Sequence, residues 1–152
     1  MVTLAAFFKY LKYLTRHRWY VFLECCKLGI PWRGLTHDLS KFLPDEWIPY
    51  MRHFYMKHSH LPEWIPQYDV AWLKHQNRNK HHWQYWILWK DSGKIYPQEM
   101  PLKYRKEMLA DWRGAGRAIT GKDDTRAFYI KNRDNITLAA ETRQWIEKQL
   151  EI

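Results

Sequence analysis

The sequence has little of what a disulfide-stapled, membrane-spanning or low-complexity protein requires. Its 152 residues include only two cysteines, and because Cys25 and Cys26 are adjacent they cannot staple a fold together. Six glycines and seven prolines form no low-complexity segment. No uncharged apolar run approaches the roughly 18 residues that would indicate a membrane span. We therefore expect no membrane association, and two buried thiols suited to a reducing cytoplasm.

The amino terminus also lacks the pattern of a secretory signal. The apolar run from Val2 to Phe8 is followed by Lys9 and Lys12 and has no small-residue cleavage site. We therefore expect no signal peptide, which again favours a cytoplasmic protein.

Aromatic residues and positive charge are abundant instead. Ten Trp, ten Tyr and six Phe must supply much of the buried surface, and this content argues against disorder. A chain of this length, 46% hydrophobic, suits one domain with a substantial core. The 25 Lys and Arg against 16 Asp and Glu give a formal net charge of +9, which attracts nucleotides, nucleic acid or anionic lipid. Charge alone does not choose among these partners.

Hydrophobic residues recur at three- and four-residue steps, which is typical of helices. The spacing predicts a long first helix that Thr3 caps and that ends at 29–31. Further helices are predicted over a short segment ending at Lys41 and over 44–54, 68–76, 81–89, 102–119, 125–132 and 140–150, with a loop over 58–67 and a turn at 91–94. No alternating pattern is long enough to build a sheet. The predicted fold class is all-α, a compact single-domain helical bundle over residues 1–152.

Histidines and aspartates stand in an order that suggests a metal site. The adjacent His37 and Asp38 offer an imidazole nitrogen and a carboxylate oxygen, donors that suit Zn, Mn or Fe and, through the carboxylate, Mg. His17 lies upstream on the long first helix and Asp111 downstream on another helix. Because a helical bundle can point side chains from several helices at one ion, we interpret these four as metal ligands.

A second group of histidines could complete a second metal position. His75, His81 and His82 are candidates, because two ions bridged by one aspartate are a common hydrolytic arrangement. Taken singly, each histidine could instead be a surface group or a hydrogen-bonded core residue. Asp111 could likewise be an exposed helix carboxylate paired with a cation.

Three cations are candidates for substrate binding. Lys41, three residues after Asp38, could be a helix-terminal cation. An ammonium group beside a metal can also bind a phosphate oxygen or stabilise charge in a transition state, and we favour that role. Arg113 and Arg117 closely follow Asp111 and are candidate phosphate clamps.

The order of His17, His37-Asp38 and Asp111 resembles the HD-domain superfamily of metal-dependent phosphohydrolases, which are helical proteins named for that dipeptide. Lys41 matches the HD-x-x-K form of many members. The resemblance implies a bundle of HD-domain type in which these residues ligate the metal.

The remaining motifs extend the resemblance. His75 with the pair His81-His82 is similar to the additional ligands of binuclear members such as HD-GYP phosphodiesterases, although the GYP segment is absent. The phrases HDLSKF, HHWQYW and ADWRGAGRAITG look like a family of phage and bacterial proteins of unassigned function, and this similarity spans nearly the whole chain.

The expected function is metal-dependent hydrolysis of a nucleotide or related small phosphoester, by a phosphomonoesterase or phosphodiesterase. The cofactor would be one or two divalent ions of Mn, Mg, Zn, Co or Fe, with Asp38 as bridging ligand and catalytic residue, and with Lys41 and Arg117 meeting the phosphate. Two alternatives remain open. The HD fold also carries di-iron oxygenases with a nearly identical ligand order. The net charge and aromatics would also fit a nucleic-acid-binding module without catalysis, although no recognised binding motif is present.

Overall fold

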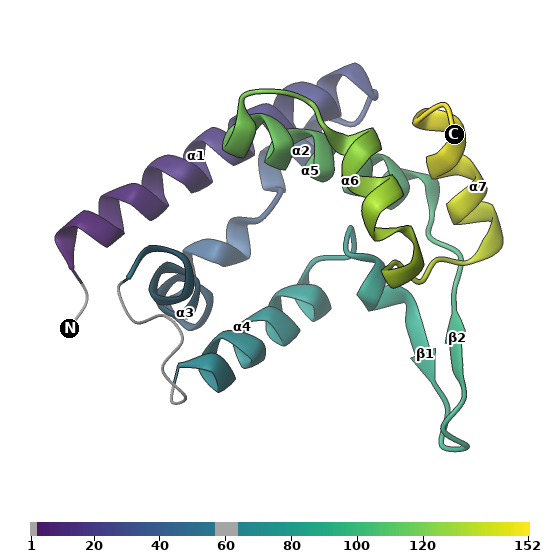
Figure 1. The fold of residues 1–152 in the computed structure, drawn as a ribbon, viewed down its shortest axis with the longest axis horizontal. Helices are drawn as coiled ribbons and strands as arrows, with labels where there is room; N and C mark the ends of the chain where they lie inside the picture. The colour runs from purple at the N-terminus through teal and green to yellow at the C-terminus, as the bar shows by residue number, and fades with distance from the viewer. Residues whose placement is uncertain (1–2, 57–63) are drawn as a thin grey trace.

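The computed structural model describes residues 3–56 and 64–152, and helices account for most of their regular structure (Figure 1). The α-helices are α1 (Leu4–Lys27), α2 (Pro31–Thr36), α3 (Pro44–Tyr55), α4 (Ile65–Arg78), α5 (Leu102–Thr120), α6 (Thr125–Asn132) and α7 (Ala140–Gln149). Short 3₁₀ helices are η1 (Leu39–Phe42), η2 (Trp83–Trp86) and η3 (Arg133–Asn135). Two strands, β1 (Ile87–Trp89) and β2 (Ile95–Pro97), complete the described elements. The predicted all-α class is confirmed.

The first helix begins and ends where its sequence predicts. The Thr3 hydroxyl accepts a hydrogen bond from the backbone N–H of Ala6 at 3.2 Å, which satisfies a donor that the helix leaves free. The helix ends at Lys27, shortly before Gly29 takes a positive φ of 74°. On its last turns Cys25 is buried but Cys26 is exposed, so the prediction of two buried thiols is wrong for the second. None of the described helices is both long and apolar enough to cross a membrane.

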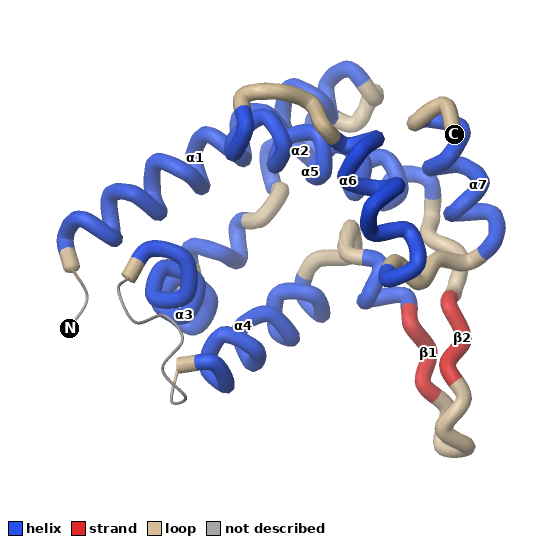
Figure 2. Tube along the Cα trace, viewed as in Figure 1, coloured by secondary structure: helices blue, strands red, loops and turns tan. Residues whose placement is uncertain are grey.

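The predicted helix over 81–89 is wrong. The segment forms η2 and then β1, which pairs antiparallel with β2 in the register Leu88 to Tyr96 across the predicted turn at 91–94. This hairpin extends away from the helices (Figure 2). With three residues in each strand, the alternation is too short to recognise in the sequence. Residues 58–63 of the predicted loop lie outside the described residues. The prediction is wrong for 65–67, which form the first turn of α4, with Pro66 near its start.

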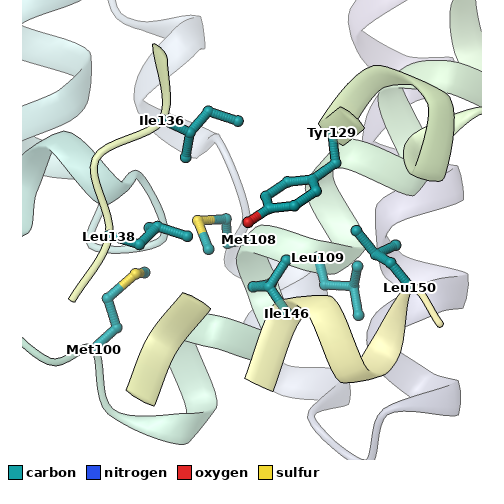
Figure 3. Close-up of a cluster of buried hydrophobic side chains, with 8 residues drawn as sticks. All are labelled: Met100, Met108, Leu109, Tyr129, Ile136, Leu138, Ile146 and Leu150. Atoms are coloured by element: carbon teal, nitrogen blue, oxygen red, sulfur yellow. The ribbon is translucent and has the colours of Figure 1, made fainter. Parts of the chain in front are cut away.

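Separate hydrophobic clusters of buried residues hold neighbouring helices together. The cluster in Figure 3 joins α5, α6 and α7 with the segments that flank them, and consists of Met100, Met108, Leu109, Tyr129, Ile136, Leu138, Ile146 and Leu150. The second joins α1, α3 and α4 through Ala6, Tyr10, Leu14, Tyr50, Met51 and Ala71. A smaller cluster of Val21, Cys25 and Ala110 joins α1 to α5.

The contact between α1 and α5 depends on a glycine. A Cβ atom added to Gly114 would lie 2.5 Å from Cγ2 and 2.9 Å from the backbone nitrogen of Val21. Val21 lies one turn after His17 on α1, and Gly114 lies one turn after Asp111 on α5. The missing side chain therefore lets the two helices approach closely at the point where each carries a candidate ligand.

We predict that Gly114→Ala lowers the free energy of unfolding by about 1–3 kcal/mol, because the added methyl group meets backbone that cannot turn aside. Urea denaturation followed by circular dichroism measures the change. Gly116→Ala is the control and should cost less, since its Cβ would meet the end of the Asp124 side chain, which can rotate away, and would approach backbone, the Lys122 oxygen, only to 3.1 Å. Equal stability of the Gly114→Ala variant and the original protein would contradict the proposed close contact.

Candidate metal centre

The adjacent His37 and Asp38 lie in a break between α2 and η1. The helix predicted to continue to Lys41 stops at Thr36, and Asp38 takes the left-handed conformation with φ of 54° and ψ of 24°. Aspartate is among the few non-glycine residues that adopt this region without great cost. Arg18 of α1 supports the break, because its Nε donates to the carbonyl oxygen of His37 at 2.8 Å. The turn brings Nε2 of His37 within 3.4 Å of Oδ2 of Asp38.

The first four predicted ligands converge on one point. Nε2 of His17 lies 3.2 Å from Oδ1 of Asp111 and 3.6 Å from Oδ2 of Asp38. Nε2 of His37 lies 3.4 Å from both Nε2 of His17 and Oδ1 of Asp111. Donors that share one ion at about 2.0–2.2 Å are separated by roughly 3 to 3.6 Å in octahedral or tetrahedral arrangements. The spacing of these four atoms therefore fits a divalent metal ion.

The second predicted group converges on the other oxygen of Asp38. Oδ1 of Asp38 lies 3.3 Å from Nε2 of His75 and 3.5 Å from Nε2 of His81. With His82, these residues offer ligand atoms that all lie within 4.8 Å of one another. Asp38 thus belongs to both groups and presents one oxygen to each, as a bridging ligand does.

Four buried atoms of this second group have no hydrogen-bond partner in the described part of the chain. They are Oδ1 of Asp38 and Nε2 of His75, His81 and His82. A buried polar atom without a partner costs about 1–3 kcal/mol, so four in one place require an explanation. A bound cation would satisfy all four.

Two glutamates that the sequence analysis did not single out fix the orientation of three imidazoles. Oε1 of Glu107 lies 3.2 Å from Nδ1 of both His37 and His81. Oε2 of Glu46 lies 2.8 Å from Nδ1 of His75. Because an ionised carboxylate only accepts, each Nδ1–H donates, so in the neutral form of each imidazole it is Nε2 that offers a lone pair for a ligand bond. This is the usual outer arrangement of histidines that ligate metals.

The glutamates are themselves held by cations. Arg33 donates to Glu107, and Nη1 of Arg78 donates to Oε1 of Glu46 at 2.7 Å. Glu107 precedes Asp111 by one helical turn, and this spacing is the signal that could have revealed it. Glu46 has no such signal, since an acidic residue in the first turn of a helix is ordinary.

The centre carries concentrated negative charge in a buried place. Asp38, Glu46 and Glu107 are each exposed by 2% or less. Burial disfavours ionisation of Glu107, but hydrogen bonds from His37 and His81 outweigh it and lower its pKa to about 2. Burial also disfavours the charged form of His37, yet the carboxylates of Asp38, Asp111 and Glu107 raise its pKa to about 10. The carboxylates therefore stay ionised and favour a cation among them.

Lys41 stands at the more open side of the centre. Its Nζ lies 2.6 Å from Oδ2 of Asp38 and 5.5 Å from the centre of the Tyr50 ring. Burial lowers the pKa of Lys41, but Asp38 and Asp111 outweigh it and raise that pKa above its usual range. The side chains of Lys41 and Asp111 are 15% and 14% exposed, whereas those of His37 and His75 are fully buried. A charged ammonium group thus borders the side from which a ligand can approach.

Arg113 and Arg117 lie in an ion cluster of their own. Arg117 pairs with Glu24, and it lies 3.6 Å from Asp123. Arg113 lies 3.6 Å from each of the same two carboxylates. Within the described residues, neither arginine forms an ion pair with the candidate metal ligands. The structure therefore brings together the seven predicted ligands and Lys41, but not the two predicted phosphate clamps.

Comparison with known proteins gives a family but no activity. No curated protein and no solved structure matches the chain. The similarity to HD-domain phosphohydrolases accordingly stays a prediction that rests on the motifs alone. Residues 6–152 match the model of a family of unknown function, DUF5662, and this range contains every candidate ligand. The chain therefore belongs to the DUF5662 family.

Proposed function

We propose that this protein is a phosphohydrolase that uses two divalent metal ions and acts on a nucleotide or related small phosphoester. The observation that carries the proposal is the pair of donor groups joined by Asp38, the second of which gathers four buried donor atoms without hydrogen-bond partners. His17, His37, Asp38 and Asp111 would hold one ion. Asp38, His75, His81 and His82 would hold the other.

The donor chemistry is compatible with hydrolysis. Imidazole and carboxylate ligands without thiolate suit Zn, Mn, Co, Fe and, through the carboxylates, Mg. Such ions, when bound, lower the pKa of a water molecule and polarise the phosphoryl oxygen of a substrate. In the reaction, a water oxygen forms the new bond to phosphorus while the ester P–O bond breaks, and the leaving oxygen takes up a proton.

The role of Lys41 follows from its place. Asp38 and the Tyr50 ring hold the ammonium group, so its N–H donors are oriented before a substrate arrives. During the reaction, negative charge on the phosphoryl oxygens is redistributed. A cation that is already held in place stabilises this charge in the transition state more than a mobile surface lysine would. Lys41 contacts the proposed metal ligand Asp38, and as a cation it would not bind the metal ion. Its ammonium group could therefore bind an oxygen of the substrate phosphate.

We predict that Asp38→Ala removes metal binding, while Glu107→Gln weakens it by roughly 10- to 100-fold, because the amide no longer accepts equally well from two imidazoles. The measurements are metal content of protein made without a histidine tag, and titration with Mn²⁺ or Zn²⁺. Glu141→Gln, an exposed carboxylate on α7, is the matched control. Full metal content in Asp38→Ala protein with native helicity would overturn the site.

We predict that Lys41→Ala retains both metals but loses roughly 100-fold or more in turnover of the best phosphoester, the scale seen when a preorganised charge-stabilising donor is removed. Lys41→Arg should recover little, because a planar guanidinium presents its charge differently. A phosphoester screen with Mn, Mg, Co, Zn and Fe identifies the substrate, and phosphate release then gives the rate. Unchanged turnover in Lys41→Ala protein would make the lysine a structural cation.

An oxygenase is the second candidate, because two histidine and carboxylate groups that share one aspartate also suit a pair of iron ions. Hydrolysis needs no dioxygen, whereas an oxygenase consumes it. We predict that phosphate release proceeds at the same rate in anaerobic buffer as in air. Oxygen uptake coupled to substrate loss by the iron-loaded protein would instead establish the oxygenase.

A further inference from the structure

A groove of about 500 Å³ lies between α1, the end of α3 and the end of α5, directly beside the metal centre. Tyr13 lines the groove, and its ring stacks on that of the candidate ligand His17, with 5.9 Å between ring centres and 14° between planes. On the opposite wall, Ala118 lies two helical turns after Asp111 on the same face of α5. One end of the groove therefore lies next to the candidate ligand His17.

The groove carries three positive charges along one wall. Lys9, Lys12 and Arg16 line it from α1, and their spacing of three and four residues places them on one face of the helix. From Lys9 to Arg16 this face extends about 10 Å along the axis. In the described part of the chain, none of the three forms an ion pair with a carboxylate, and no acidic residue lines the groove. These charges are therefore available to an anionic ligand.

The other wall is aromatic and apolar. Phe54 and Tyr55 line the groove from α3, and Ile119 lines it from α5. Phe54 is 56% exposed and Ile119 is 70% exposed, so both present apolar surface to solvent. Aromatic rings beside cations are a combination that binds nucleobases together with phosphates, because each base has a flat face that can stack.

We propose that this groove binds the part of the substrate beyond the reacting phosphate, and that the substrate is a nucleotide with two or more phosphate groups, in which water would replace the P–O anhydride bond between the terminal phosphate and the next one. The inference rests on the proposed phosphohydrolase function, in which the metal centre holds the phosphate that reacts. If the substrate had only one phosphate and the metals held it, Lys9 and Lys12 farther along α1 would have no negative group of the substrate to bind. A volume of about 500 Å³ suits a mononucleotide and not a long strand.

The test measures binding without turnover. Metal-free protein is titrated with ATP, ADP, AMP, adenosine and inorganic tripolyphosphate, and binding is followed by calorimetry. We expect affinity to fall in the order ATP, ADP, AMP and adenosine. Lys9→Glu with Lys12→Glu should weaken ATP binding by about 10-fold or more, because two attractions become repulsions. Lys94→Glu with Lys148→Glu makes the same change in net charge at exposed positions outside the groove, and it should weaken binding much less.

A second variant tests the aromatic wall. Phe54→Ala should weaken binding of ATP but leave binding of tripolyphosphate unchanged, since tripolyphosphate has no base to stack. Absence of ATP binding to the original protein, or equal loss in the two charge-reversed variants, would overturn the groove assignment. Tighter binding of a single-stranded oligonucleotide than of ATP would also overturn it, in favour of a nucleic-acid site.

The inference and the proposed function can fail separately. ATP binding that depends on Lys9 and Lys12, without phosphate release from any phosphoester by metal-loaded protein, would keep the groove as a nucleotide site and reject the hydrolase. Phosphate release by the original protein, without groove-dependent binding, would keep the hydrolase and reject the groove.

Discussion

The buried carboxylate of Asp38 is the group around which the rest of the centre is arranged. It is 1% exposed, and its two oxygens lie within 3.6 Å of His17, His37, His75 and His81 and at 2.6 Å from Lys41. A carboxylate removed from water is costly unless cations and hydrogen bonds compensate it. The left-handed backbone at this residue is uncommon outside glycine and is supported here by the contact of Arg18 with the His37 carbonyl. Both features are typical of a functional site.

Charges alternate outward from this carboxylate. The imidazoles next to it are oriented by Glu46 and Glu107, and these are in turn held by Arg78 and Arg33. Each layer limits the rotation of the layer inside it, so the Nε2 atoms of His37, His75 and His81 are held facing the centre. This arrangement would make binding of the proposed metal ions less costly, because few side chains would need to be ordered.

The helix packing serves the same centre. Gly114 allows α5 to approach α1 closely, and this contact sets the 3.2 Å between His17 and Asp111. The face of α1 that carries His17 also carries Tyr13 one turn earlier, and Tyr13 lines the groove, so the groove and the candidate metal centre share a wall. A change in this helix contact would therefore alter both the ligand spacing and the groove.

Periodicity and local chemistry in the sequence determined much of the fold. The Thr3 cap, the helix over 125–132 and the end of α1 before Gly29 are local features, so they could be predicted. The order of His17, His37-Asp38 and Asp111, with its resemblance to HD-domain proteins, also indicated which side chains to consider as ligands. The sequence could not show that 81–89 ends in a strand, since three-residue strands depend on pairing across the turn.

Only the tertiary structure decided which charges belong to the centre. Glu107 and Arg113 both lie near Asp111 in the sequence, yet Glu107 points at His37 and His81 while Arg113 joins Glu24 and Asp123. On a helix, the two lie on different faces, and what each face meets depends on helices far away in the chain. The sequence by itself therefore determined the helices and the candidate donors. The packing of α1, α4 and α5, together with the break at Asp38, decided which partners those donors meet. The physical reason is that the distances between donor atoms depend on contacts between residues 20 to 94 positions apart.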